Sequence, residues 1–442
     1  MHTSHRESAE AVPAVVVGLD CITGLQTTRV LAHRGVPVIG VAEVARHFAC
    51  RTRLCERKLF ASTHSERLVD ALEQIGHELE AAGRGRAVLV PCTDSSVLWI
   101  SRSRERLQKH FRIALPSASV VEMMLDKKAF CEFAMAHDLP IPRTLFLASR
   151  KDAEQAASEM GFPCILKPPR KTPRWEEATK VKAFRVACRS ELLELYDRCS
   201  AWAEILMVQE WIEGSDADLY SCNCYFDRQG QPQAVFTARK LRQWPPRTGT
   251  SCLGEACRND ELREVATRLF RAVDYRGLGY LEMKRDPRSG QQWIIEPNIG
   301  RPTGRSAIAE AGGVELLYTM YCDLVGLPLP AAREQTDGNA KWIYWRQDLR
   351  SAFYYWRQGE LGLSEWLRSL AGRKATAVFS WTDPLPFCAD WWSLVGKSLR
   401  RSRSENRPKL RGEVPPRGAR GLPPQSEPAE VPIIAAGARG ER

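Results

Sequence analysis

Two carboxylates and an amide side chain gather on a predicted hairpin in the middle of the chain. Glu282 lies in one alternating apolar run, and Glu296 and Asn298 end the next one. Residues two apart on a strand share a face, so Glu296 and Asn298 can point together, with Glu282 one strand away. Their oxygens are hard ligands that suit Mg²⁺, which usually bridges carboxylates to substrate phosphates. The alternative is a solvated surface, against which the apolar residues just before Glu296 argue.

Two lysines occupy positions from which a side chain can reach a cleft. Lys127 follows Asp126 at a predicted helix start, and Lys167 ends the short apolar strand that begins at Cys164. A lysine there is a compact positive charge suited to phosphate oxygens. Most lysines are only solvated, so each of these indicates little by itself.

The N-terminal third alternates predicted strands with predicted helices. The apolar, β-branched runs predict strands over 14–18, 36–41 and 87–91, and the amphipathic segments predict helices over 24–34 and 68–82. Strands that alternate with helices indicate a parallel, doubly wound sheet.

The rest of the chain differs in pattern. Segments 218–226 and 233–240 predict one antiparallel pair, and 279–285 with 292–296 predict a second, which indicates an α+β core. Seven of the 13 tryptophans follow residue 340, where we expect a small helical subdomain that packs these rings.

Composition excludes several classes of protein. The 442 residues are 44% hydrophobic and 26% charged, as in ordinary globular proteins, and no apolar run is long enough to span a membrane. The start lacks the pattern of a signal peptide, and the 14 cysteines form no CxxC pair, so we expect reduced cysteines and a cytoplasmic protein.

The positive charge is concentrated at the C-terminus. The net charge is +11, and the last 46 residues carry 11 basic against five acidic side chains. We therefore expect no nucleic-acid partner for the body of the chain. Residues 391–403 join Trp391 and Trp392 to several basic side chains, which leaves peripheral membrane contact as an alternative to a packed helix with a solvated tail.

The order of short motifs carries more information than any one of them. The motifs are Asp-Lys at 126–127, Leu-Pro-Ile-Pro at 139–142, Phe-Pro-Cys-Ile-Leu-Lys-Pro at 162–168, Val-Gln-Glu-Trp-Ile-Glu-Gly at 208–214, Glu-Met-Lys at 282–284 and Ile-Glu-Pro-Asn at 295–298. This order resembles the ATP-grasp superfamily over roughly residues 14–330, and is most similar to its members called carboxylate–amine ligases.

The resemblance implies a domain order within a fold of mixed α/β and α+β class. A Rossmann-like parallel sheet precedes a two-lobed ATP-grasp core, and a small aromatic-rich subdomain and a disordered tail follow. The expected parts are a flexible start (1–12), the Rossmann-like domain (13–118), the ATP-grasp core (119–330), the C-terminal helical subdomain (331–396) and the disordered basic tail (397–442).

The resemblance also implies roles for individual residues, with ATP and Mg²⁺ as cofactors. Glu282, Glu296 and Asn298 match the metal ligands. Arg301 suits a substrate carboxylate or the developing phosphate charge, with Arg239 and Lys240 as further catalytic candidates. In the ATP site, two lysines bind phosphates, a hinge segment reads the adenine through Gln209 or Glu210 and the Ile212 N–H, and an aspartate holds the ribose. The expected ATP-binding residues are Lys127, Lys167, Lys182, Gln209, Glu210, Trp211, Ile212, Asp216 and Asp218.

One segment departs from the family pattern. Many members carry a glycine-rich loop after the second lysine, whereas residues 168–184 contain no glycine. This segment is either a phosphate lid made of basic side chains or a disordered surface insertion. Its basic residues are Arg170, Lys171, Arg174, Lys180 and Lys182.

Two N-terminal turns have open roles. The turn from Gly18 to Gly24 lacks the spacings of dinucleotide and Walker-type sites, so it either packs or contacts the acceptor substrate, as do residues 93–95.

The resemblance implies an ATP-dependent ligase that activates a small-molecule carboxylate as an acyl phosphate, which an amine then attacks to form an amide. The alternative is a nucleotide-binding sensor or scaffold without ligase turnover. The sequence identifies neither the acid nor the amine, and it does not give the oligomeric state.

Overall fold

The computed structural model describes residues 11–393 apart from Lys171, Lys180, Thr248, Arg305, Asp337 and Asn339. The predicted basic tail (397–442) and nearly all of the flexible start (1–12) lie outside the described residues. The described residues 11–393 fall in one compact unit, so the predicted boundaries at 118 and 330 stay predictions. Among the described helices, none is both long and apolar enough to cross a membrane.

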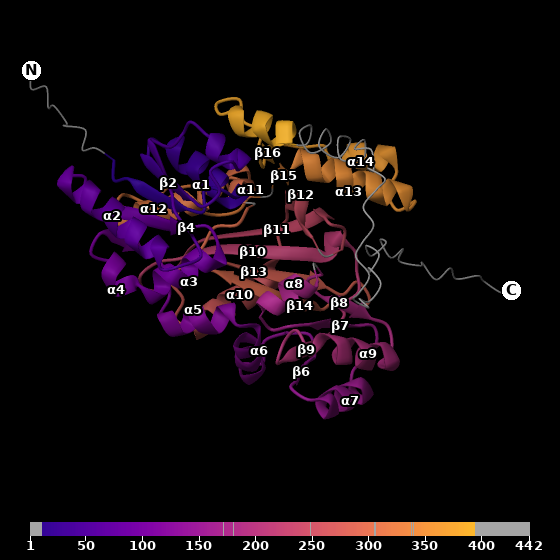
Figure 1. The fold of residues 1–442 in the computed structure, drawn as a ribbon. Helices are drawn as coiled ribbons and strands as arrows, with labels where there is room; N and C mark the ends of the chain where they lie inside the picture. Colours follow the sequence, from indigo (N-terminus) through magenta and orange to yellow (C-terminus); the bar gives the residue numbers. More distant parts are fainter. Residues whose placement is uncertain are drawn as a thin grey trace, which may run out of the picture. The chain divides into compact units, whose positions relative to one another are not determined.

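A five-stranded sheet forms the N-terminal region (Figure 1, indigo). All its strand pairs are parallel, in the order β3-β2-β1-β4-β5, which confirms the predicted parallel sheet. Alternate β1 residues point into different cores: Val15 and Val17 pack with helix α2, and Ala14 and Val16 with helix α1. The elements are β1 (Ala14–Val17), α1 (Ile22–Ala32), β2 (Val38–Ala42), η1 (Phe48–Arg51), β3 (Arg57–Phe60), α2 (Arg67–Ala81), β4 (Ala87–Pro91), α3 (Asp94–Arg102), α4 (Arg104–Leu107) and β5 (Phe111–Ile113).

A four-stranded antiparallel sheet forms one wall of the site described below. Its order is β6-β9-β7-β8, and α7 and α9 contact each other beside it (Figure 1, magenta). Two helices, α5 and α6, lead into it. The elements are α5 (Ala118–Leu125), α6 (Lys127–Ala136), β6 (Thr144–Leu147), α7 (Arg150–Glu159), β7 (Cys164–Lys167), α8 (Pro173–Ala178), β8 (Phe184–Val186), α9 (Arg189–Cys199) and β9 (Leu206–Glu210).

The glycine-free segment 168–184 contains the helix α8, so its described residues are not a disordered insertion. Trp175 is 1% exposed, stacks edge-on against Phe184 and Trp202, and donates its indole N–H to the Val181 carbonyl. The segment is therefore anchored by one buried ring.

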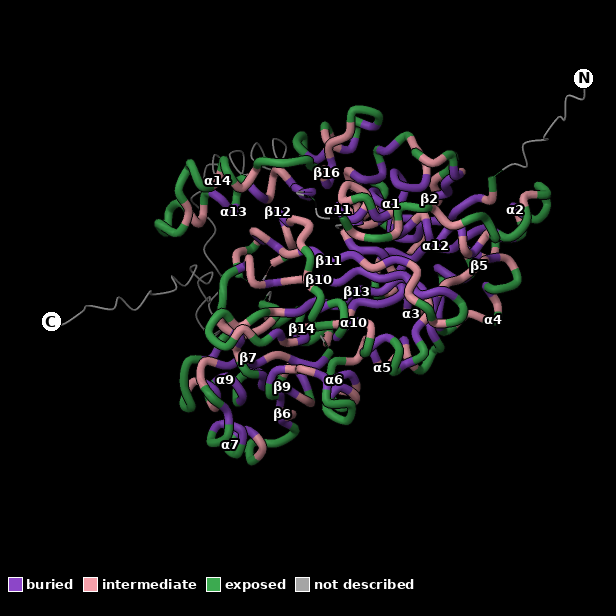
Figure 2. The backbone as a smooth tube through the Cα atoms, turned by 180° about the vertical axis from the view of Figure 1, so that it is seen from behind, coloured by how far each residue is buried: buried purple, intermediate pink, exposed green. Residues whose placement is uncertain are grey.

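The largest sheet has seven strands in the order β14-β13-β10-β11-β12-β15-β16. Both predicted antiparallel pairs are confirmed, and Figure 2 shows β10, β11 and β13 running through the buried interior. Helix α10 packs with one face of this sheet and α12 with the other. The elements are η2 (Asp216–Asp218), β10 (Leu219–Phe226), β11 (Pro232–Trp244), β12 (Thr250–Ala256), α10 (Asp260–Ala272), β13 (Gly277–Arg285), β14 (Gln292–Ile299), α11 (Ser306–Ala311) and α12 (Leu316–Val325).

The C-terminal segment is not the purely helical subdomain that we predicted. It contributes the strands β15 (Lys341–Ile343) and β16 (Lys374–Thr376), and β15 pairs with β12 and so extends the seven-stranded sheet. Its helices are α13 (Trp345–Arg357) and α14 (Leu363–Ser369).

A buried ion pair fastens this segment to the N-terminal sheet. Asp383 accepts hydrogen bonds from Arg29 Nε (3.0 Å) and from Thr52 Oγ1 (2.8 Å), and its side chain is fully buried. Burial lowers the pKa of Arg29, which Asp383 partly offsets. Removing one partner of such a pair leaves an uncompensated buried charge.

Asp383→Ala should therefore lower the free energy of unfolding by about 3–5 kcal/mol. Urea unfolding of the full chain measures this change. The matched control is Glu360→Ala, which removes an exposed ion pair with Arg247 and should cost less than about 1 kcal/mol. Equal midpoint shifts in the two variants would contradict the anchoring role of Asp383.

Candidate nucleotide and metal site

One cavity of about 670 Å³ brings together most of the predicted site residues. Its walls come from the four-stranded sheet, the start of α6 and one face of the seven-stranded sheet. The predicted residues that line it are Lys127, Lys167, Lys182, Gln209, Glu210, Trp211, Ile212, Lys240, Glu282, Glu296, Asn298 and Arg301.

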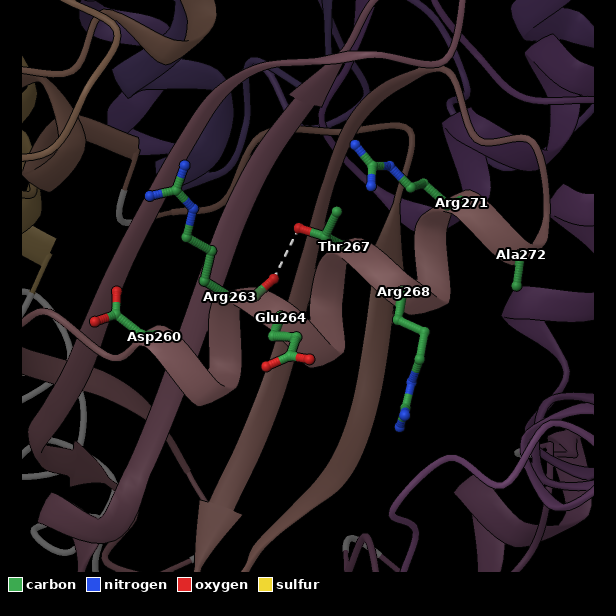
Figure 3. Close-up of a pocket in the computed structure, with 7 residues that line it drawn as sticks. All are labelled: Asp260, Arg263, Glu264, Thr267, Arg268, Arg271 and Ala272. Carbon is green, nitrogen blue, oxygen red and sulfur yellow. Dashed lines mark hydrogen bonds between the residues drawn. The ribbon is translucent and has the colours of Figure 1, made fainter.

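A second hollow of similar volume lies along the exposed side of α10 (Figure 3). It is lined by seven residues of that single helix, with basic side chains such as Arg263 beside acidic ones such as Glu264. It contains none of the predicted site residues, so we base the functional argument on the first cavity.

The positive side of the cavity is built at the ends of two elements. Lys127 is the first residue of α6, whose N-cap Asp126 accepts backbone N–H bonds from Lys128 (2.8 Å) and Ala129 (3.1 Å). Arg170, from the glycine-free segment, pairs with the other oxygen of Asp126 at 2.6 Å. The helix start that carries Lys127 is thus held by a cap and an ion pair.

Lys167 is half-buried, and its hydrogen bond goes to a neutral group. Its Nζ donates to Gln209 Oε1 at 3.0 Å, and Gln209 Nε2 donates to Thr144 Oγ1 at 2.8 Å. Burial, followed by the nearby charge of Lys127, lowers the pKa of Lys167 to about 8. An anion between the two lysines would relieve both effects.

The negative side of the cavity depends on an irregularity in β14. Glu282 pairs with Glu296, but the next residue, Met283, pairs with Ile294, so Ile295 is an extra residue in the strand. Regular pairing would have put Glu296 opposite Leu281, which packs in the core with α10. The bulge reverses the alternation and brings Glu296 and Asn298 to the face of Glu282.

These side chains form a donor set made only of oxygens. Glu282 Oε1 accepts from Lys240 Nζ at 2.8 Å, and both side chains are nearly buried. Asn298 Oδ1 accepts from Arg301 at 2.6 Å, whereas its buried Nδ2 has no hydrogen-bond partner among the described residues. Glu296 is exposed to the cavity. Two carboxylates and an amide oxygen are ligands that a hard divalent cation such as Mg²⁺ takes, so the residues present fit that ion.

Arg301 links this donor set to the N-terminal sheet. Its Nε donates to Asp94 Oδ1 at 2.6 Å, and its guanidinium lies 5.9 Å from the centre of the Tyr280 ring. Ile22 and Thr23, in the first turn of α1, also line the cavity. The two turns whose roles the sequence left open therefore both reach the cavity.

Three predicted residues do not line the cavity. Arg239 and Lys240 are consecutive residues of β11, so their side chains lie on opposite faces of the sheet, and Arg239 pairs with Glu255 at 2.6 Å. Asp216 is buried and accepts from Gln243 Nε2 (2.7 Å) and from the Tyr355 hydroxyl (2.8 Å). Asp218 caps the short helix η2 by accepting from Ser215. Each of these side chains is engaged by other protein groups, and their roles toward the substrate or ATP stay predictions.

Gln209 lines the cavity, and its side chain contacts Lys167 and Thr144. Both ends of its amide are engaged, by Lys167 and by Thr144, so it positions the lysine, and its contact with adenine stays a prediction. Glu210 is exposed beside it at the end of β9.

Sequence analysis missed two residues that share the face of Glu282. Tyr280 and Lys284 both line the cavity, and burial lowers the pKa of Lys284, whose Nζ lies 5.2 Å from the Trp211 ring centre. Both lie two residues from Glu282, and alternate residues of a strand point to the same face. This spacing could have predicted that they face the cavity with Glu282.

No protein family model matches the chain. Among curated proteins, it is 23% identical over 249 residues to a D-aspartate ligase of Enterococcus faecium, covering 54% of this chain and 58% of the ligase. It is 27% identical over 234 residues to a D-alanine–D-alanine ligase of Methylococcus capsulatus, covering 51% of this chain and 67% of that enzyme. The chain therefore spans less than two thirds of the length of the first of these relatives.

Solved structures share the fold. An N5-carboxyaminoimidazole synthetase of Staphylococcus aureus superposes with a TM-score of 0.57 at 13% identity, over 73% of this chain and 80% of that one. A biotin carboxylase of Campylobacter jejuni, solved as a β-γ-ATP complex, superposes with a TM-score of 0.57 at 16% identity, over 75% of each chain.

Two sheets thus enclose one cavity, in which lysine side chains and oxygen-bearing side chains lie together. The chain has the ATP-grasp fold of these solved structures, which confirms the fold class that the motif order predicted. Its sequence relatives are ligases of the kind that the motif order resembles.

The low pKa of Lys167 predicts how ATP affinity depends on pH. The lysine is charged below about pH 8 and neutral above it, so ATP affinity should fall by up to about tenfold per pH unit above that value. Fluorescence or calorimetric titration between pH 6.5 and 9.5 measures this. Lys167→Arg is the control, since arginine stays protonated and should flatten the profile. An unchanged fall in that variant would show that another group is responsible.

Proposed function

We propose that this chain is an ATP-dependent ligase that joins a small-molecule carboxylate to an amine. The observation that carries the proposal is the opposition of Lys127 and Lys167 to Glu282, Glu296 and Asn298 across one cavity. Phosphoryl transfer requires positioning and neutralisation of charge more than a protein nucleophile, and this arrangement supplies both. The sequence relatives, which are named as D-aspartate and D-alanine–D-alanine ligases, favour the same chemistry.

The two lysines would bind the triphosphate, and Glu210, Trp211 and Ile212 at the end of β9 would contact the base. Gln209 keeps the Lys167 ammonium aimed into the cavity. Glu282, Glu296 and Asn298 would hold Mg²⁺, which supplies neutralisation of the phosphate charge. Lys182, from the glycine-free segment, also lines the cavity and would add charge above the phosphates.

In the first chemical step, a substrate carboxylate oxygen attacks the γ-phosphorus, and the bond from that phosphorus to ADP breaks. Arg301 is suited to hold the substrate carboxylate or the charge that develops on the phosphate, because Asp94 and Asn298 fix its guanidinium from two sides. The amine then attacks the acyl carbon, phosphate leaves, and a proton is lost from nitrogen. Water must be kept out meanwhile, since it would hydrolyse the acyl phosphate.

An ADP-release assay with pooled amino acids and other carboxylates tests the ligase function. ADP formation that requires both an acid and an amine, with one amide formed per ADP, is the expected result. ATP binding without acid-dependent ADP formation would contradict the ligase and favour a nucleotide-binding sensor or scaffold.

Glu296→Gln tests the metal role, because it keeps the side-chain shape and removes the charge. Loss of one electrostatic stabiliser should reduce ADP formation at least about a hundredfold while nucleotide binding remains. Glu264→Gln, on the exposed side of α10, is the matched control and should change neither. A lowered melting temperature with near-normal turnover per folded molecule would contradict the metal assignment.

A further inference from the structure

A histidine pair and a glutamate meet at the edge of the N-terminal sheet, away from the ATP cavity. We propose that His77, Glu80 and His110 form a binding site for a divalent transition-metal ion, with the chemistry of a zinc site. One ligand atom from each residue lies within 4.8 Å of the others. None of the three lines the cavity described above. The proposal therefore stands independently of the ligase function.

The three side chains come from two elements that the fold brings together. His77 and Glu80 are three residues apart near the C-terminal end of α2, a spacing that puts both on one side of a helix. His110 lies directly before β5, the edge strand of the five-stranded sheet. The rings of His77 and His110 meet edge to face with centres 4.5 Å apart, and His110 Nδ1 lies 3.9 Å from Glu80 Oε2.

A glycine in the middle of α2 makes this meeting possible. A Cβ atom at Gly76 would lie 2.4 Å from His110 Cβ and 2.5 Å from its Cγ, so any larger residue would push the histidine away. Glycine inside a helix destabilises it relative to alanine. At this position the glycine makes the helix less stable but lets His110 pack directly against it. The His110 ring is therefore held in place before an ion binds.

The ligand chemistry differs from that of the ATP cavity. Two imidazole nitrogens and one carboxylate oxygen suit Zn²⁺ and similar ions, whereas the oxygen set of Glu282, Glu296 and Asn298 suits Mg²⁺. The His110 side chain is 10% exposed and that of Glu80 is 74% exposed, so an ion can enter from solvent and keep a water as a fourth ligand. Bound there, it would tie α2 to the start of β5.

Titration of the metal-stripped full chain with Zn²⁺ and Co²⁺ tests the site. Calorimetry should find one more Zn²⁺ equivalent in the unaltered protein than in His77→Ala, and Glu80→Gln should weaken that equivalent at least about tenfold. A hundredfold excess of Zn²⁺ over the dissociation constant should raise the melting temperature by about 3 °C, and His77→Ala should lose this rise. The control His64→Ala alters an exposed histidine that lies 3.5 Å from Glu43, and it should behave like the unaltered protein.

Two further readouts keep the result specific. Fourteen cysteines offer competing ligands for Co²⁺. The Co²⁺ absorption that the unaltered protein shows and His77→Ala lacks should therefore contain no charge-transfer band of a thiolate. With Mg²⁺ supplied and no Zn²⁺ added, ADP formation by His77→Ala should equal that of the unaltered protein, which separates this site from the ligase proposal. His77 is exposed on its helix, so this variant should fold. Equal Zn²⁺ stoichiometry and equal Co²⁺ spectra in His77→Ala and the unaltered protein would overturn the proposal.

Discussion

The arrangement of charge in one cavity is the constraint on which the rest of the structure depends. Lys127 and Lys167 approach each other on one side, and burial makes the charge on Lys167 costly, as its lowered pKa records. Glu282 and Glu296 approach each other on the other side. Each pair of like charges is unfavourable alone, and a polyphosphate with a divalent cation would neutralise both.

Much of the surrounding fold fixes the positions of these charged side chains and directs them into the cavity. The Ile295 bulge turns Glu296 and Asn298 toward the cavity, and the Lys240 ammonium compensates part of the charge on Glu282. On the other side, the Asp126 cap fixes the start of α6, and Gln209 holds Lys167 with a neutral hydrogen bond. The C-terminal segment closes the structure through Asp383 and Arg29 rather than forming a separate helical unit.

The sequence predicted those parts of the fold whose pattern is set by burial. β1, β2 and β4 are buried along their whole length and read as continuous apolar runs, which is why they could be recognised. Strand β3 (57–60) has no buried residue, and β5, β15 and β16 have three residues each, too few to show a period. Those strands are defined by their partners in the sheet.

The same distinction applies to the site. Motif order predicted the lysines and the oxygen-bearing side chains that line the cavity. Arg239 and Lys240 are neighbours on one strand, and only the pairing decides which of them faces the cavity. The sequence did not show which groups the Asp216 carboxylate contacts. Its partners Gln243 and Tyr355 are distant in sequence and reach it only in the folded chain. The proposed metal site joins His77 and Glu80 on α2 to His110 just before β5, and no local spacing connects residues 77 and 110.

The most direct test of this account is a crystal structure of the chain with a non-hydrolysable ATP analogue and Mn²⁺ in place of Mg²⁺. The account predicts an anomalous manganese peak within bonding distance of the oxygens of Glu282, Glu296 and Asn298, with the triphosphate against Lys127 and Lys167. Manganese bound elsewhere, or a triphosphate that contacts neither lysine, would contradict it.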